Sequence, residues 1–368
     1  MHRCFPVLLF PVILLACSNR ETTSTVEIID GVRFVHNLEP LWGADPDIGL
    51  EFIQTIGQAE TDDDRYLLYF PVDGAADNEG NIYILDSRRP AIRKYDSAGI
   101  HIADFGGKGS GPGEFRSSLC LDTDGEFNLY LSDMDNARIN VFNSDGSFNR
   151  MVALGNFFHF FCVLSTGQIA GFDLSREEDP PKVARLLDRK GNMISTFGES
   201  KPAEDSMMAF LMNQCNIESD SVDDIYVSFN HFNRIEKFAP DGSLLMHIDR
   251  PLNFDVEHKA RTSTYESGGE LREYADPLLT YVSDRIGVDG QDRLWVLSFN
   301  AQPNETGSAS SVFEDHTILQ FDIFDREGVL LCRIPVPLPM SRFRVYGDQL
   351  LLIDPYQNVC IHKYRIAG

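Results

Sequence analysis

Residues 75–106 read AADNEGNIYILDSRRPAIRKYDSAGIHIADFG, and residues 120–155 read CLDTDGEFNLYLSDMDNARINVFNSDGSFNRMVALG. Each stretch holds four short runs of strand-favouring residues separated by turn residues, which is typical of a four-stranded antiparallel sheet. Similarity at a period of roughly 20 to 50 residues indicates a repeat architecture, and four strands per unit indicate the blades of a β-propeller.

The same turn recurs between the third and fourth runs of each unit. Asp or Asn opens such a turn through its side chain, and Gly adopts the positive φ that closes it. The closing glycines are 47, 45, 51 and 86 residues apart. The turns are Asp96-Ser97-Ala98-Gly99, Asn143-Ser144-Asp145-Gly146, Asp188-Arg189-Lys190-Gly191, Pro240-Asp241-Gly242 and Asp325-Arg326-Glu327-Gly328.

The long last interval is interpreted as one blade with two polar insertions, residues 250–284 and 301–315, rather than as a hidden seventh blade. The first insertion, around residues 267–274, is predicted to be helical. A sixth unit begins near Arg342, and the sequence stops at Gly368 where its fourth strand is expected. Residues 51–57 resemble the fourth strands of other units, so we expect an N-terminal strand to complete the last blade and close the ring.

The sequence therefore predicts an all-β, six-bladed propeller over residues 46–368, with its last blade closed by residues 51–57. Residues 17–45 are predicted to be a tether and lead-in, with Phe34 and Trp42 packed on the propeller. Because the closing strand follows this lead-in, the last blade is expected to lie nearest the attachment point. The predicted blades span 75–106, 120–155, 161–198, 215–249, 285–335 and 342–368.

The N-terminus has the features of an export signal. Arg3 precedes a short apolar run and a small residue, which predicts a cleaved signal peptide at residues 1–16. The stretch Leu14-Leu15-Ala16-Cys17 resembles the lipobox of bacterial lipoproteins, which implies lipid on the Cys17 thiol. The alternative is an ordinary cleaved signal followed by a chance cysteine. Ser18 is compatible with sorting to the outer membrane.

A family resemblance rests on the first two units. Residues 105–115, FGGKGSGPGEF, followed by Leu129–Asp133 and Ala137–Phe142, resemble the NHL repeat, and in particular the six-bladed propeller lipoproteins of bacteria, a mostly uncharacterised family. This resemblance implies a platform for protein or ligand binding, or, in a minority of such propellers, an enzyme with a metal at the central channel. The glycine-rich loop 106–113 lacks the strand-turn-helix setting of a phosphate site and is expected to connect two blades.

The amino-acid composition narrows the classes of partner that the protein is expected to bind. The formal net charge is -24, and nucleic-acid binding relies on Lys and Arg, so a nucleic-acid partner is not expected. The local signatures of zinc proteases, thiol redox proteins and α/β-hydrolases are absent from the sequence. We predict an envelope protein, anchored in the membrane through Cys17, that binds a protein, peptide or glycan. The alternative is a metal-dependent lyase or hydrolase with an ion on the axis. A protein without enzymatic activity is favoured over this alternative.

The loops between second and third strands fall on one face of the disc, and loops on a rigid scaffold usually carry function. For Arg138 and Arg234, pairing with acidic neighbours to hold the blades together is an equally weighted explanation. The candidate binding residues on these loops are Arg88, Arg89, Asn136, Arg138, His231, Asn233, Arg234 and Tyr356.

Metal and disulfide predictions are minor. Four carboxylates at the ends of second strands, Asp86, Asp133, Asp173 and Asp354, could hold Ca²⁺, although Asp there commonly bonds the next turn. The prediction is therefore no cofactor, with Ca²⁺ as the lesser alternative. Cys332 and Cys360 are a possible disulfide pair.

Overall fold

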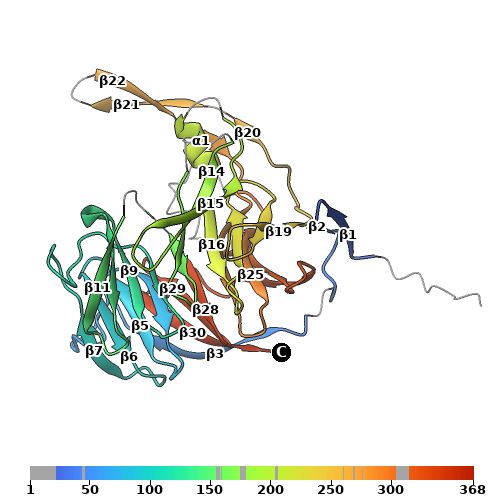
Figure 1. The fold of residues 1–368 in the computed structure, drawn as a ribbon. Coiled ribbons are helices and arrows are strands. Elements are labelled where there is room, and N and C mark those ends of the chain that lie inside the picture. The colour runs from blue at the N-terminus through green and yellow to red at the C-terminus, as the bar shows by residue number, and fades with distance from the viewer. Residues whose placement is uncertain are drawn as a thin grey trace, which may run out of the picture.

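The computed structural model describes residues 22–43, 46–154, 158, 160–174, 180–203, 206–259, 261–267, 270–275, 277–303 and 315–368. Within these residues, six sheets of four or more strands surround a common axis, so the protein is a six-bladed β-propeller (Figure 1). The fold prediction is confirmed. The predicted signal peptide, residues 1–16, and the predicted lipidation site Cys17 lie outside the described residues.

The first three blades follow one another in sequence. Blade one contains β4 (Pro71–Ala76), β5 (Ile82–Asp86), β6 (Ala91–Tyr95) and β7 (His101–Phe105). Blade two contains β8 (Leu121–Thr123), β9 (Leu129–Asp133), β10 (Arg138–Phe142) and β11 (Phe148–Ala153). Blade three contains β12 (Phe161–Val163), β13 (Ile169–Phe172), β14 (Lys182–Leu187) and β15 (Met193–Glu199).

The last three blades are more elaborate. Blade four contains β16 (Cys215–Ser219), β17 (Ile225–Phe229), β18 (Ile235–Phe238) and β19 (Leu244–Asp249). Blade five contains β24 (Ser283–Val288), β25 (Leu294–Phe299), β26 (Leu319–Phe324) and β27 (Leu330–Pro335). Blade six contains β28 (Arg342–Tyr346), β29 (Gln349–Asp354), β30 (Cys360–Ala367) and the N-terminal strand β3 (Gly49–Ile56).

The first strand of each blade lies innermost, and neighbouring first strands contact one another all the way round the axis: β4, β8, β12, β16, β24 and β28. Because successive strands alternate in direction, two kinds of connection share one face of the disc. They are the links between second and third strands and the links from one blade to the next. We call this face the loop face.

The turn chemistry is as predicted. Asp96 Oδ1 accepts the backbone N–H groups of Ala98 and Ile100 at 2.9 and 2.8 Å, which fixes the hairpin between β6 and β7. The closing glycines have φ values between 81° and 88°, a region in which a Cβ is strained. They are Gly99, Gly146, Gly191, Gly242 and Gly328.

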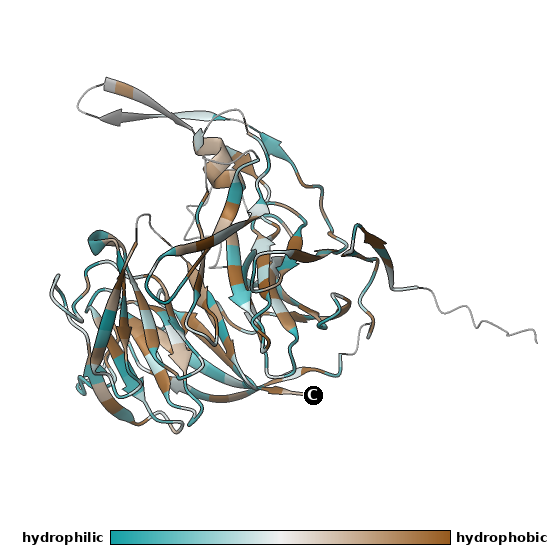
Figure 2. Cartoon of the chain, viewed as in Figure 1, coloured by the Kyte–Doolittle hydropathy of each residue, from teal (hydrophilic) through white to brown (hydrophobic). Residues whose placement is uncertain are grey.

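The hydrophobic core lies between the blades. Trp295 of β25 is fully buried, and its ring packs edge-on against Phe321, which in turn packs against Phe343 of blade six. Along the blade strands, hydrophobic and hydrophilic residues are interspersed (Figure 2). Cys332 and Cys360, the possible disulfide pair, are both free and buried.

The ring is closed by the N-terminal strand, as predicted. Strand β3 pairs antiparallel with β30, from Gly49 opposite Ala367 to Ile56 opposite Ile361. Blade six therefore combines strands from opposite ends of the sequence, which fastens the first and last parts of the propeller together.

The lead-in is more ordered than a tether. Residues 24–37 form a hairpin of β1 (Ser24–Ile29) and β2 (Val32–Asn37), and β2 pairs in parallel with β19. The prediction that Phe34 and Trp42 pack on the propeller is confirmed: Phe34 stacks on His247, and Trp42 packs against the core between blades five and six. The chain thus joins the fold at blade four, not at blade six as the closing strand suggested.

The first insertion, residues 250–284, lies on the loop face, and residues 304–314 of the second insertion lie outside the described residues. Helix α1 (Ser206–Met212) precedes blade four, and short 3₁₀ turns occur at Met134–Asn136 and His316–Ile318. Residues 250–284 contain two pairs of strands: β20 (His258–Lys259) with β23 (Leu278–Leu279), and β21 (Thr262–Ser267) with β22 (Glu270–Ala275). The latter hairpin projects away from the disc (Figure 1).

The prediction of helix around residues 267–274 is therefore wrong. Residues 262–267, TSTYES, contain β-branched and aromatic side chains that favour a strand. A Gly-Gly pair between two such short runs is a hairpin signal, and it outweighs the helix-favouring residues Glu270 and Leu271.

None of the helices in the described part of the chain has the length and apolar character needed to cross a membrane.

Candidate ligand-binding site

Three of the predicted binding residues are exposed on the loop face next to the junction of blades one and six. The Arg88 guanidinium lies 4.8 Å from the centroid of the Phe70 ring, and the Tyr356 ring packs edge-on against the same Phe70 at 5.6 Å. Arg89 is exposed, and its backbone N–H points to Asp86. Arg88 and Tyr356 therefore form a small cation–aromatic surface cluster, with Arg89 beside it.

Asn136 and Arg138 have internal partners. Arg138 forms an ion pair with buried Asp133 at 3.0 Å, and its guanidinium donates to the carbonyl groups of Ser110, Gly111 and Glu114. Asn136 Nδ2 donates to the same Asp133 carboxylate at 2.7 Å. These residues fasten the glycine-rich loop onto blade two, as expected for a connection between blades.

His231, Asn233 and Arg234 are also engaged in local contacts. His231 is buried, with Nδ1 2.9 Å from the Thr280 carbonyl oxygen, and burial lowers its pKa to about 4. Asn233 donates to the Arg250 carbonyl oxygen at 2.6 Å, and Arg234 Nε donates to Glu236 at 2.8 Å. The structure thus separates the eight predicted residues into an exposed cluster and two sets that hold loops in place.

The four repeated aspartates each have protein partners, and Asp354 shows the backbone contacts of a turn. Asp86 accepts the N–H groups of Tyr69 and Phe70 at 2.8 and 2.9 Å, and Asp173 pairs with Arg185 at 2.9 Å. Among the described residues, one group of ligand-type side chains is compact enough to hold an ion, and it lies in blade six.

A cavity opens near the axis on the loop face and was not foreseen from the sequence. Its volume is about 250 Å³, slightly below the roughly 300 to 1,000 Å³ of pockets for drug-sized ligands. We call it the axial pocket. It is lined by Phe160, Phe172, Phe210, Gln214, Cys215, Asn216, Asn230, Asp284 and Arg285, contributed by blades three, four and five and by the segment that contains α1.

Arg285 provides the positive charge of the axial pocket. Its Nη1 donates to Asn216 Oδ1 at 2.6 Å, and Asn216 Nδ2 donates to Asn230 Oδ1 at 2.8 Å. The guanidinium lies 4.0 Å from the Phe160 ring centroid. Burial lowers the pKa of Arg285 to about 10, so it stays charged at neutral pH. Its buried Nε lies 3.3 Å from Asp284, yet it has no hydrogen-bond acceptor within the described structure.

Deeper on the axis lies a cluster of charged side chains from the innermost strands, which we call the axial cluster: Asp73, Asp122, Glu218, Arg342 and Arg344. Asp73 is fully buried and pairs with Arg342 at 2.6 Å and with Arg344 at 2.7 Å. Burial opposes ionisation of Asp73, but the two guanidinium groups hold its pKa below the ordinary value.

Two carboxyl groups of the axial cluster are less well compensated. Burial, followed by the nearby Asp122 charge, raises the pKa of Glu218 to about 8. Burial raises the pKa of Asp122 to about 6 although Arg344 opposes this shift. Carboxyl groups with raised pKa values are common in functional sites, although ion-pair networks also produce them.

The sequence does contain a signal for these residues. Innermost propeller strands are expected to be apolar, yet Arg342-Phe343-Arg344 and Asp284-Arg285 place charges within first strands. Charged side chains at positions that the repeat assigns to the axis are therefore a sequence marker of the axial cluster.

Comparison with known proteins supports the fold alone. No protein-family model matches the chain, and no curated protein matches it in sequence. Among solved structures, a DUF4221-family protein from Bacteroides vulgatus has a TM-score of 0.57 at 10% identity, covering 87% of this chain and 98% of that one.

A candidate exported protein from Bacteroides fragilis has a TM-score of 0.55 at 12% identity, covering 88% of this chain and 97% of that one. A Bacteroides thetaiotaomicron protein of unknown function has a TM-score of 0.53 at 11% identity, with coverage of 87% and 76%. The chain is thus similar in fold to several bacterial propellers.

Proposed function

We propose that the protein is an exported, lipid-anchored binding protein whose loop face binds an envelope protein, peptide or glycan, with the axial pocket as the centre of the site. The observation that carries the proposal is the pocket itself, in which a partly buried arginine lies among aromatic rings and side-chain amides. A concave site with a few fixed polar groups on apolar walls is the usual form of a ligand site.

The chemistry of the pocket favours a peptide over a glycan. Phe160, Phe172 and Phe210 offer apolar walls, and the Asn230 and Gln214 amides match the hydrogen-bonding groups of a peptide backbone. The guanidinium of Arg285, whose Nε is ion-paired with Asp284 at 3.3 Å but makes no hydrogen bond in the described structure, suits a carboxylate or carbonyl oxygen. The exposed cluster of Arg88 and Tyr356 lies on the same face and extends the surface toward blades one and six.

The anchoring part of the proposal is supported by the position of the first ordered strand. Ser24 follows Cys17 by seven residues, a reach of at most about 25 Å. Strand β1 exposes Ile28 at 71%, Ile29 at 48% and Val26 at 44%, and Figure 2 shows this hydrophobic strand at the edge of the molecule. An apolar edge so close to a lipidated residue is compatible with contact at a bilayer surface.

The alternative of a metal-dependent lyase or hydrolase with an axial ion gains no support from the axial cluster. Arg342 and Arg344 already place two guanidinium groups on Asp73, the fully buried carboxylate of the axial cluster. A further positive charge there would be repelled, so a binding function agrees better with the charges observed.

The binding function is tested by photo-crosslinking in intact cells. A photoreactive phenylalanine at Phe210, on the wall of the axial pocket, is expected to yield a discrete crosslinked product. The same group at exposed Lys190, in the turn on the opposite face, is the control and should not yield that product. Identical products from both positions, or none from Phe210, would refute binding at the pocket.

The anchor is tested separately with the Cys17→Ala variant. We expect the wild-type protein to take up a labelled fatty acid and to partition into detergent, and the variant to do neither. A variant that remains in the detergent phase would rule out lipid on Cys17, whatever the crosslinking shows.

A further inference from the structure

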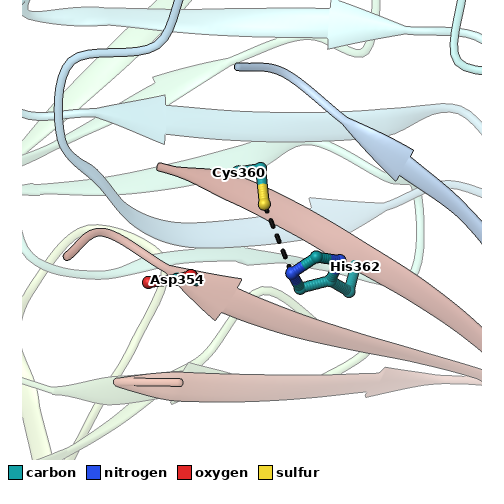
Figure 3. A group of neighbouring side chains, drawn as sticks. All are labelled: Asp354, Cys360 and His362. Atoms are coloured by element: carbon teal, nitrogen blue, oxygen red, sulfur yellow. Dashed lines mark hydrogen bonds between the residues drawn. The ribbon is translucent and has the colours of Figure 1, made fainter. Parts of the chain in front are cut away.

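Three potential metal ligands share one face of blade six. Asp354 of β29 lies opposite Cys360 of β30, and His362 follows Cys360 by two residues, so all three side chains point to the same side of the sheet. Their ligand atoms lie within 4.8 Å of one another, and no residue of the three is more than 9% exposed. Figure 3 shows the Cys360 sulfur directed at the His362 ring, with Sγ 3.3 Å from Nε2.

Blade two has other residues at these positions. There the equivalent Asp133 lies opposite Arg138, with Asn140 two residues further along β10. Arg138 neutralises Asp133 at 3.0 Å, and Asn140 Nδ2 lies 3.5 Å from the same carboxylate. Blade two therefore compensates its buried carboxylate with a cation and an amide.

Blade six lacks that cation. Cys360 and His362 stand where blade two has its arginine and asparagine, and Asp354 forms no ion pair with any described residue. Its carboxylate accepts only local hydrogen bonds, from the N–H groups of residues 356–358 and the Asn358 amide. A buried charge is stabilised by hydrogen bonds together with a positive partner, and in the described structure Asp354 has the hydrogen bonds without the cation. The two side chains that replace the arginine and asparagine are a soft and a borderline metal ligand.

We propose that Asp354, Cys360 and His362 form a binding site for a zinc-class divalent ion. The combination of thiolate, imidazole and carboxylate is a typical zinc ligand set, whereas Ca²⁺ needs six to eight oxygens. Zinc bonds of about 2.3 Å to sulfur and about 2.0 Å to nitrogen at a tetrahedral angle put the two atoms about 3.5 Å apart. The observed Sγ–Nε2 distance is 3.3 Å, so this pair is nearly in place.

The surroundings orient the ligands. His362 Nδ1 lies 3.0 Å from Thr55 Oγ1 of β3, and a hydrogen bond donated by Nδ1 leaves the Nε2 lone pair free for the ion. Ion binding releases the Cys360 thiol proton to water, and three protein ligands leave one position for a water molecule. Because Thr55 belongs to the closing strand, the ion would reinforce the seam at which the ring is closed.

The experiment is a Co²⁺ titration of the reduced full-length protein, followed by competition with Zn²⁺. We expect one equivalent of Co²⁺ to produce a thiolate-to-cobalt charge-transfer band and tetrahedral visible bands, which Zn²⁺ abolishes. Cys360→Ser should remove the charge-transfer band, and His362→Gln should weaken Co²⁺ binding at least tenfold. Thr55→Val should weaken binding about tenfold through loss of the orienting bond.

Cys332→Ser is the matched control, because Cys332 is an equally buried free thiol in blade five. It should leave every band unchanged. Circular dichroism verifies that each variant is folded, and the two ligand variants act independently, so misfolding of one does not remove the test. The absence of a thiolate–cobalt band in the wild type, its persistence in Cys360→Ser, or its loss in Cys332→Ser would each overturn the site.

Discussion

The protonation of Glu218 should be visible in the pH dependence of stability. Glu218 lies in the axial cluster, where burial and the nearby Asp122 raise its pKa to about 8 from an ordinary value of 4.5. Between these two values the folded protein holds a proton that the unfolded chain has released. The free energy of unfolding therefore falls as pH rises toward 8, and the stabilisation present at low pH is lost above it.

The size of the effect follows from the same numbers. The full difference between 4.5 and about 8 corresponds to about 5 kcal/mol at about 1.4 kcal/mol per pH unit. The pKa of about 8 already includes the opposing charge of Arg344 at 3.5 Å. Only about 1.5 pH units of the difference fall above pH 6.5. We therefore expect the free energy of unfolding to fall by about 2 kcal/mol between pH 6.5 and 9. This window lies above the pKa of about 6 of Asp122.

Glu218→Gln removes the titrating group and keeps the shape of the side chain. Urea unfolding, followed by the fluorescence of Trp42 and Trp295, should show a variant whose midpoint is flat over this window while that of the wild type falls. Glu51→Gln, at an exposed surface pair with Arg365, is the control and should follow the wild type. Parallel curves for wild type and Glu218→Gln would show that Glu218 is ionised at neutral pH and would refute this reasoning.

Three further predictions concern contacts that hold the fold. Arg138→Met leaves the Asp133 carboxylate buried without its cation and should lower the free energy of unfolding in urea by about 3 kcal/mol. Arg88→Ala, on the surface, should change it by less than about 0.5 kcal/mol. Equal effects would mean that Arg138 does not fasten the glycine-rich loop. Asn37→Ala removes hydrogen bonds to blades four and five and should lower the free energy of unfolding by about 2 kcal/mol. A change below about 0.5 kcal/mol would show that the β1–β2 hairpin is only loosely attached. Deletion of residues 49–56 should abolish cooperative thermal unfolding, since it opens the ring at blade six; an unchanged Tm would contradict ring closure by β3.

The fold was predictable because its signal is local and repeated. The turn at Gly99 requires a positive φ, and the same requirement recurs in four other blades, so a few residues define the repeat length. The insertion at 250–284 has no such repetition. Its strands β21 and β22 are six residues each, too short for their periodicity to separate a strand from a helical turn.

The candidate site was only partly predictable. Topology correctly places Arg88 and Arg138 on the same face, but not the directions of their side chains. Arg138 turns inward to Asp133, while Arg88 stays at the surface on Phe70. The axial pocket joins residues as far apart as Phe160 and Arg285, and no local spacing records that these two approach to 4.0 Å.

The route of the N-terminal segment has a mechanical consequence. The hairpin β1–β2 lies on blade four, the next residues cross the outer strand of blade five through backbone bonds to Leu330 and Leu331, and only then does β3 enter blade six. A pull on the N-terminus therefore loads the hairpin first, and Asn37 and the Leu41 and Trp42 amides next. The ring-closing strand would feel tension only after these fastenings had failed, so drag on the propeller is absorbed at its rim before it can open the seam.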